Sequence, residues 1–149
     1  MGLLDGMFEV RKDITKVEGY YQGGYANFGT KGNMAVQIEK NKLVLKQFWK
    51  KRYELDLKDV KDVQFKTEEE ITKDVTLTRL LAFGIFAFGV KKKRKKERCF
   101  LIITTEEDGF TNDIILEMNA LEGIGSVITQ GFVKTLRKEV IKYRDKEHV

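Results

Sequence analysis

The stretch that decides the fold is "KKRYELDLKDVKDVQFK", residues 50–66. Apolar and charged side chains alternate strictly through its first half. The apolar set is Tyr53, Leu55 and Leu57, and the charged set is Arg52, Glu54 and Asp56. A period of two places the two sets on opposite faces of a β-strand, with one face toward a core. The residues "LKDV" then bend the chain, and Val63 and Phe65 resume the apolar phase in a second strand.

Further strands precede this stretch. Alternating patterns cover residues 17–29 ("VEGYYQGGYANFG"), 34–38 and 43–49, with a tight turn at "EKNK", residues 39–42. Tyrosine, valine and isoleucine suit a pleated, half-buried surface. Glycines at 19, 23 and 24 interrupt the first pattern, and a glycine inside a strand predicts a bulge or a close backbone approach.

Other strands follow it. We predict one over 71–78 ("ITKDVTLT"), a continuous apolar strand over 99–105 ("CFLIITT") and another over 113–119 ("DIILEMN"). Asp108-Gly109 stands between the last two, and this dipeptide is a hairpin signal. The three glutamates at 68–70 are interpreted as a solvated strand end.

The period then changes to that of a helix. Asn119 and Glu122 form a capping-box-like start, and the apolar stripe that follows ends near Asp145. Its members recur every three or four residues: Leu121, Ile124, Ile128, Phe132, Leu136, Val140 and Tyr143. Glycines at 123, 125 and 131 weaken this helix by about 1 kcal/mol each relative to alanine, so it needs close tertiary packing. A short amphipathic helix is predicted within residues 1–16, either as a cap on the core or as an interfacial anchor.

Residues 34–66 are similar to bacterial pleckstrin-homology-like (PH-like) and GRAM-like domains. The shared pattern is an apolar strand, a tight turn, a second strand, and a third that ends in an "L-x-D-V-x-x-V" bend, here Leu57, Asp59, Val60 and Val63. The resemblance covers about residues 17–145. It implies a mainly β fold, a bent antiparallel sheet of about seven strands capped by one long C-terminal helix. We therefore expect a short helix over 1–16 and a PH-like domain over 17–149, with an insertion at 79–98.

The motif "WKKRY", residues 49–53, echoes the phosphoinositide-binding "WKKRW" of eukaryotic PH domains. Here it falls at a different position, which we count as between the second and third strands, and the usual upstream partner lysine is absent. We interpret Lys50, Lys51 and Arg52 as a charged turn, not as an inositol-phosphate site.

The insertion holds the unusual chemistry of the chain. Leu80–Val90 is a run of eleven residues without a polar side chain, and positions 91–98 hold seven Lys/Arg and one Glu. The rest of the chain holds 21 of the 28 basic and 22 of the 23 acidic residues, so the whole positive excess lies in this segment. The run is too short for a transmembrane helix, which needs about 20 apolar residues.

Three interpretations of the insertion stay open. The apolar run packs on the sheet beneath a solvated basic loop, or it enters a bilayer interface while the basic residues meet anionic headgroups, or it forms a protein interface, including one between copies of the chain. A nucleic-acid role is disfavoured because no aromatic residue is interleaved with the lysines. The residues expected to contact the membrane or partner are Phe83, Ile85, Phe86, Phe88, Lys91, Lys92, Lys93, Arg94, Lys95, Lys96 and Arg98.

Catalytic chemistry is poorly supplied. The only serine, Ser126, and the only histidine, His148, lie on or just past the predicted helix and are 22 positions apart, which is roughly 33 Å at 1.5 Å per residue. The lone Cys99 excludes an intramolecular disulfide, and we expect it to be buried. We predict a non-enzymatic recognition domain with no cofactor, metal or small-molecule substrate. Because no signal peptide is visible, we expect it in the cytoplasm, with peripheral association with the inner face of the membrane as one option.

Overall fold

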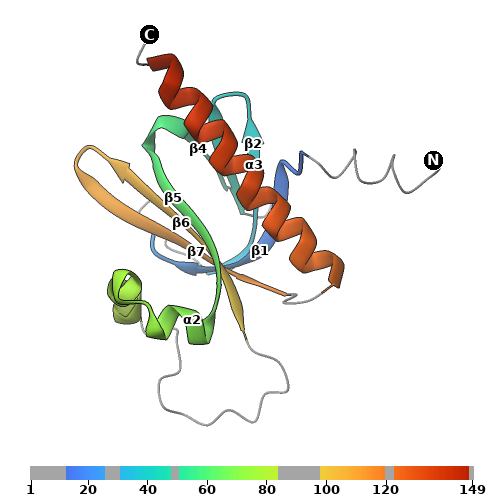
Figure 1. Ribbon diagram of the computed structural model, residues 1–149, viewed down its shortest axis with the longest axis vertical. Coiled ribbons are helices and arrows are strands. Elements are labelled where there is room, and N and C mark those ends of the chain that lie inside the picture. The colour runs from blue at the N-terminus through green and yellow to red at the C-terminus, as the bar shows by residue number, and fades with distance from the viewer. Residues whose placement is uncertain (1–12, 26–30, 48–50, 84–97, 120–122, 148–149) are drawn as a thin grey trace, which may run out of the picture.

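The computed structural model describes residues 13–25, 31–47, 51–83, 98–119 and 123–147 (Figure 1). Its strands are β1 (Lys16–Gly23), β2 (Gly32–Glu39), β3 (Lys42–Gln47), β4 (Lys51–Asp56), β5 (Val60–Thr67), β6 (Cys99–Glu107) and β7 (Phe110–Met118). Its helical elements are the 3₁₀ helices η1 (Leu57–Asp59) and η2 (Val75–Phe83) and the α-helices α2 (Glu68–Lys73) and α3 (Gly123–Glu147). The strands form one antiparallel sheet in the order β4-β3-β2-β1-β7-β6-β5. The predicted mainly β fold with a C-terminal helix is confirmed.

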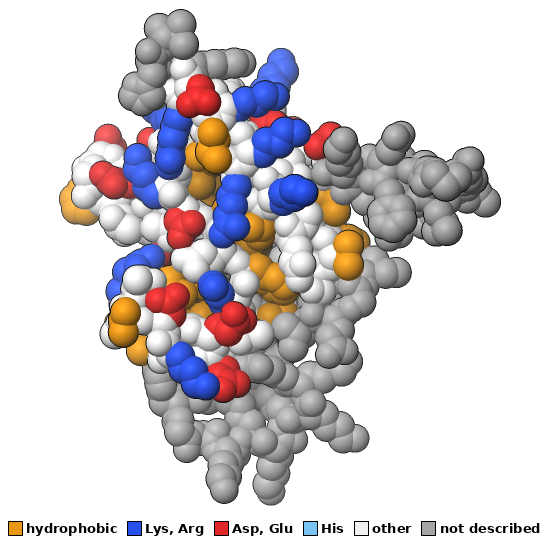
Figure 2. Space-filling model, in the orientation of Figure 1, with side chains coloured by type: hydrophobic (Ala, Val, Ile, Leu, Met, Phe, Trp, Pro, Cys, Tyr) orange, Lys and Arg blue, Asp and Glu red, His pale blue; other side chains and the backbone are white. Residues whose placement is uncertain are grey.

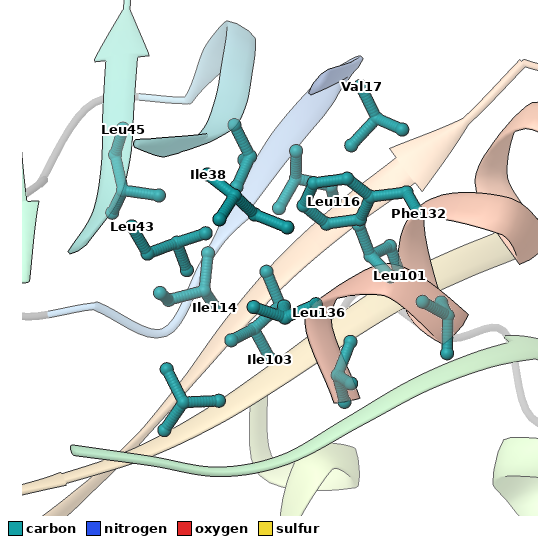
Figure 3. Close-up of a cluster of buried hydrophobic side chains, with 14 of the residues drawn as sticks. Val17, Ile38, Leu43, Leu45, Leu101, Ile103, Ile114, Leu116, Phe132 and Leu136 are labelled. Carbon is teal, nitrogen blue, oxygen red and sulfur yellow. The ribbon is translucent and has the colours of Figure 1, made fainter. Parts of the chain in front are cut away.

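The main core lies between the sheet and α3, which crosses one face of it (Figure 1). Phe132 and Leu136 project from α3 against strand residues such as Leu101, Ile103 and Leu116, as Figure 3 shows. All five are fully buried. Burying a leucine, isoleucine or phenylalanine side chain contributes roughly 1.5–3 kcal/mol. Packing on the sheet therefore stabilises a helix whose glycines make it intrinsically weak.

The predicted bend between residues 57 and 63 is confirmed, and its geometry explains the motif found there. Asp56 Oδ1 accepts a hydrogen bond from Lys58 N at 3.2 Å and so caps η1. Val60 and Val63 are both buried although they stand three residues apart. A strand with a strict period of two would turn one of them outward. A register shift between Val60 and Asp62 restores the phase and keeps both valines in the core.

Three predictions that involve glycine are confirmed. A Cβ on Gly19 would lie 2.7 Å from Met118 Sδ, so β1 and β7 approach too closely there for a side chain. A register shift lies between Tyr21 and Gly23, and Gly23 has φ +132°. In α3, a Cβ on Gly131 would lie 2.6 Å from Ile14 Cδ1, which shows the close packing that the helix glycines indicated. Asp108 and Gly109 make the predicted hairpin turn with φ values of 52° and 82°.

The strand predicted over 71–78 is wrong, because α2 and η2 occupy these positions. Thr67 and Glu70 form a capping box that starts α2: Thr67 Oγ1 accepts from Glu70 N at 3.1 Å, and Glu70 Oε1 accepts from Thr67 N at 2.9 Å. The glutamates at 68–70 therefore begin a helix, not a solvated strand end, and Glu68 is buried.

The physical reason for α2 and η2 is a second apolar patch on the outer face of the sheet, away from α3. This patch comprises Phe100, Ile102 and Ile115, and α2 and η2 cover it with Ile71, Leu77 and Leu80. The continuous apolar run of β6 thus faces two cores, because Leu101 and Ile103 point into the main one. Of the helix predicted within 1–16, residues 13–16 are described and are not helical, since Lys16 already starts β1; residues 1–12 and Glu122, at the predicted start of α3, lie outside the described residues.

Candidate functional site

The apolar part of the insertion begins inside the second cluster. Leu80 is fully buried there, Leu81 packs against the cluster from its edge, and Ala82 is exposed. Phe83 ends η2. The insertion therefore starts from a fixed, buried root and not from an exposed turn.

Arg79 fixes this root to the sheet. Its guanidinium pairs with both carboxylate oxygens of Asp113 on β7, at 2.9 Å each, and donates to Thr76 O at 2.6 Å. Thr104 Oγ1 on β6 donates to Asp113 Oδ1 at 2.7 Å. The hydrogen bond to the Asp113 carboxylate is the main reason that the pKa of Arg79 is raised above its ordinary value. A bidentate pair of this kind fixes orientation as well as distance.

Arg98 fixes the other root, where the chain enters β6. Its guanidinium bonds to Glu68 Oε2 of α2 at 2.9 Å and to Glu117 Oε1 of β7 at 2.7 Å. The side chains of Arg98 and Glu68 are only 12% and 8% exposed. Glu68 N also donates to Arg98 O at 2.8 Å. The Arg98 guanidinium also lies over the ring of Phe100, with its Cζ 4.9 Å from the ring centroid.

The two anchors share one strand. Asp113 and Glu117 stand four residues apart on the same face of β7, with Ile115 of the second cluster between them. At about 3.3 Å per residue, the two carboxylates are roughly 13 Å apart along the strand. Both ends of the insertion are thus tied to the outer face of the sheet, at its lower end in Figure 1.

Most of the residues expected to contact a membrane or partner fall outside the described residues. These are Ile85, Phe86, Phe88, Lys91, Lys92, Lys93, Arg94, Lys95 and Lys96; of Phe83 only the backbone is described. Arg98 is the exception, and the structure places its charge between two carboxylates within the molecule. For the start of the apolar run, the structure shows that Leu80 and Leu81 pack on the sheet and that Ala82 is exposed.

A second surface, which sequence reasoning missed, is a groove between β5 and α3. Two hollows of about 200 and 420 Å³ lie along it, and Arg137 lines both. Basic residues line the groove from both elements: Lys61, Lys66, Lys134, Arg137 and Arg144. Figure 2 shows Lys and Arg side chains gathered over α3 and the strand beside it, with hydrophobic side chains between them. We call this surface the β5–α3 groove.

Arginines of α3 also complete the edge of the sheet at this groove. Arg137 Nη2 donates to Val63 O at 2.6 Å, and Arg144 Nη2 donates to Val60 O at 3.1 Å. Because β5 is the last strand of the sheet, these carbonyls have no neighbouring strand, and the helix supplies donors in its place.

The structure also locates the other residues that were considered as sites: the "WKKRY" motif, Cys99 and Ser126. Lys51 starts β4, so the last three residues of the "WKKRY" motif lie in β4, not between the second and third strands. The charged turn predicted for Lys51 and Arg52 is therefore wrong, because both pair with β3, and Lys50 lies outside the described residues. Arg52 pairs with Glu39 at 2.9 Å and Glu54 at 3.0 Å. Cys99 is buried, as expected, with Sγ 3.4 Å from Met118 O. Ser126 is buried in α3 and accepts a hydrogen bond from Gln130 Nε2 at 3.0 Å.

No protein-family model matches the chain, and a comparison with curated proteins finds no match either. Within the described ranges, no helix combines the length and the apolar character needed to cross a membrane.

Proposed function

We propose that the protein is a non-enzymatic, PH-like recognition domain that binds the surface of a membrane containing anionic phospholipids. Contact is made by the insertion between Arg79 and Arg98. Phe83, Ile85, Phe86 and Phe88 enter the interface, and Lys91–Lys96 meet the headgroups. The observation that carries the proposal is that the whole positive excess of the chain lies between two roots fixed to one face of a folded sheet.

The charge that remains for the membrane is large after Arg98 is left out. Positions 91–97 hold six basic residues and Glu97. A Lys or Arg near an anionic surface contributes about 1 kcal/mol. Six such residues beside an apolar run match the two-part signal, one apolar and one basic, that stable peripheral attachment requires.

The PH-like assignment is supported by architecture. Seven antiparallel strands and a C-terminal helix that packs on the sheet agree with what the resemblance implies. The "L-x-D-V-x-x-V" motif also serves a defined purpose here, since it turns β4 into β5 through η1 and a bulge.

The test is sedimentation with vesicles of phosphatidylcholine alone or mixed with phosphatidylserine. We expect binding to the mixed vesicles only, and weaker binding at higher salt because exposed charges are screened. The triple variant Lys91→Gln/Lys92→Gln/Lys93→Gln removes about 3 kcal/mol of the binding free energy. It should therefore weaken binding about 100-fold.

The matched control is Lys61→Gln/Lys66→Gln/Lys134→Gln, which removes three charges from the β5–α3 groove instead. It should sediment like the unmodified protein. Equal binding to both vesicle types, or equal weakening by the two triple variants, would refute the proposal.

A further inference from the structure

The β5–α3 groove points to a second ligand, distinct from the membrane. We propose that it binds an extended, acidic segment of a partner protein. Three features of the groove support this ligand: its cations form no ion pairs among the described residues, its two arginines are regularly spaced, and exposed apolar side chains lie beside them.

The cations of the groove are not neutralised by ion pairs within the described part of the chain. Among the described residues, none of Lys61, Lys66, Lys134, Arg137 and Arg144 forms an ion pair with a carboxylate. The acidic residue that lines the groove is Asp62, and its carboxylate accepts from Val63 N at 2.9 Å and Gln64 Nε2 at 2.7 Å. Two further carboxylates lie near the groove lysines, Asp59 near Lys61 and Asp74 near Lys66. Five cations against these three carboxylates still leave a positive potential, which is concentrated on the α3 side and selects an anionic ligand.

The two arginines are held in place by the sheet. Each guanidinium has five N–H donors in a planar fork, and the hydrogen bond of each to β5 uses one nitrogen. The other donors remain for a ligand. Val60 O and Val63 O already accept hydrogen bonds from the two arginines. A partner segment therefore cannot use these two carbonyls to pair with β5 as an added strand. It is recognised through its carboxylates, which form the strong, charge-assisted bonds that arginine favours.

The spacing of the arginines defines the ligand further. Arg137 and Arg144 are seven residues apart, which is about 10 Å along a helix. Their acceptors Val63 and Val60 are three residues apart, also about 10 Å along a strand. A polyproline II segment repeats every three residues over about 9 Å. Carboxylates at every third residue of such a segment therefore reach both guanidiniums from one side.

The groove also presents some apolar surface. The valines that line it are buried, but Ile141 is 58% exposed and Phe65 is half-buried. A small free anion would use the cations alone. Ile141 and Phe65 can contact the uncharged residues of a peptide, so the surface fits a peptide better than an isolated phosphate.

The experiment measures fluorescence anisotropy of a labelled (Glu-Pro-Pro)₃ peptide with the full chain, and (Gln-Pro-Pro)₃ is the control peptide. We expect binding of the glutamate peptide only. The groove variant Lys61→Gln/Lys66→Gln/Lys134→Gln should weaken it at least tenfold. None of these lysines bonds to the β5 carbonyls, so the fold is retained, and circular dichroism checks this.

The control variant is Lys91→Gln/Lys92→Gln/Lys93→Gln, which removes the same number of positive charges from the insertion. It should change the peptide affinity less than threefold. Equal affinity for the two peptides, or no binding of either, overturns the proposal. So does a stronger effect of the insertion variant than of the groove variant. If the groove variant loses vesicle sedimentation but binds the peptide unchanged, the groove is a membrane surface and the proposal fails. Since the two assays respond to different triple variants, each proposal fails independently of the other.

Discussion

Replacement of Arg98 by methionine should destabilise the fold by about 3 kcal/mol, because it removes the cation from a buried carboxylate. Arg98 bridges Glu68 and Glu117, at 2.9 and 2.7 Å. Deleting one member of a buried ion pair costs about 3–5 kcal/mol. Glu117 is 28% exposed and also accepts from Gln22 Nε2 at 2.9 Å. It therefore keeps solvation after the substitution, and the expected loss lies at the lower end of that range.

Urea denaturation measures this loss. With a slope of about 2 kcal/mol per molar urea, the midpoint should fall by about 1.5 M. The double variant Arg98→Met/Glu68→Met should recover most of the stability, since an apolar replacement of a buried ion pair is often neutral or stabilising. A loss below about 1 kcal/mol in the single variant, or a double variant no more stable than the single one, would show that Arg98 is not a buried anchor.

Two further substitutions test other parts of the fold. Gly19→Ala should cost roughly 1–3 kcal/mol by overpacking, because its Cβ would lie 2.7 Å from Met118 Sδ and 3.1 Å from Glu117 O; an unchanged urea midpoint would contradict the close approach of β1 and β7. Burial raises the pKa of Tyr21, so the stability contributed by its protonated hydroxyl is present below about pH 10 and is lost as the pH rises through the folded-state pKa. Tyr21→Phe should be about 1 kcal/mol less stable at pH 7, because the hydroxyl donates to Tyr25 O at 3.1 Å and accepts from Tyr25 N at 2.9 Å. Urea titrations should show this difference in stability shrinking above pH 10. A difference that stays constant with pH would refute a stabilising role for the protonated hydroxyl.

The strands and the long helix were predictable because each has one apolar face over a single core. Leu55 and Leu57 are buried while Arg52 is exposed, as a period of two requires. Phe132 and Leu136 are buried at helical spacing. Local periodicity records such one-sided burial directly, and no knowledge of distant residues is needed to read it.

The prediction over 71–78 failed because it followed the phase of Val75 and Leu77. Val75 is 85% exposed, whereas Leu77 is fully buried, so the two residues do not share a face. A helical signal was present, since Thr67 and Glu70 have the spacing of a capping box. The reason to form a helix there is the outer apolar patch of β6 and β7, which appears only once those strands are paired.

The β5–α3 groove was missed for an electrostatic reason. Along α3, six Lys/Arg are spread over residues 134–146 with Glu139 and Asp145 among them, so they form no run as dense as residues 91–98. The fold separates these charges, because Glu139 lines a different hollow with Lys40 and Lys142. The net charge of a sequence therefore indicates how the whole molecule attracts charged ligands. It does not indicate the charge of a groove that is formed by two separate elements.

The position of the two proposed surfaces has a consequence for binding. The roots of the insertion are tied to the outer face of β7 through Asp113 and Glu117, whereas α3 packs on the opposite face of the sheet. Because the roots are held by ion pairs and a buried cluster, attachment through the insertion also orients the sheet, with less entropy to lose than a segment on loose ends. The β5 wall of the β5–α3 groove reaches these roots, because Asp62 lies close enough to Arg79 to raise its pKa and Lys66 pairs in register with Phe100. The other wall belongs to α3, on the opposite face of the sheet. A domain held at a membrane by the insertion would thus leave the α3 wall, with Lys134, Arg137 and Arg144, open to a partner protein.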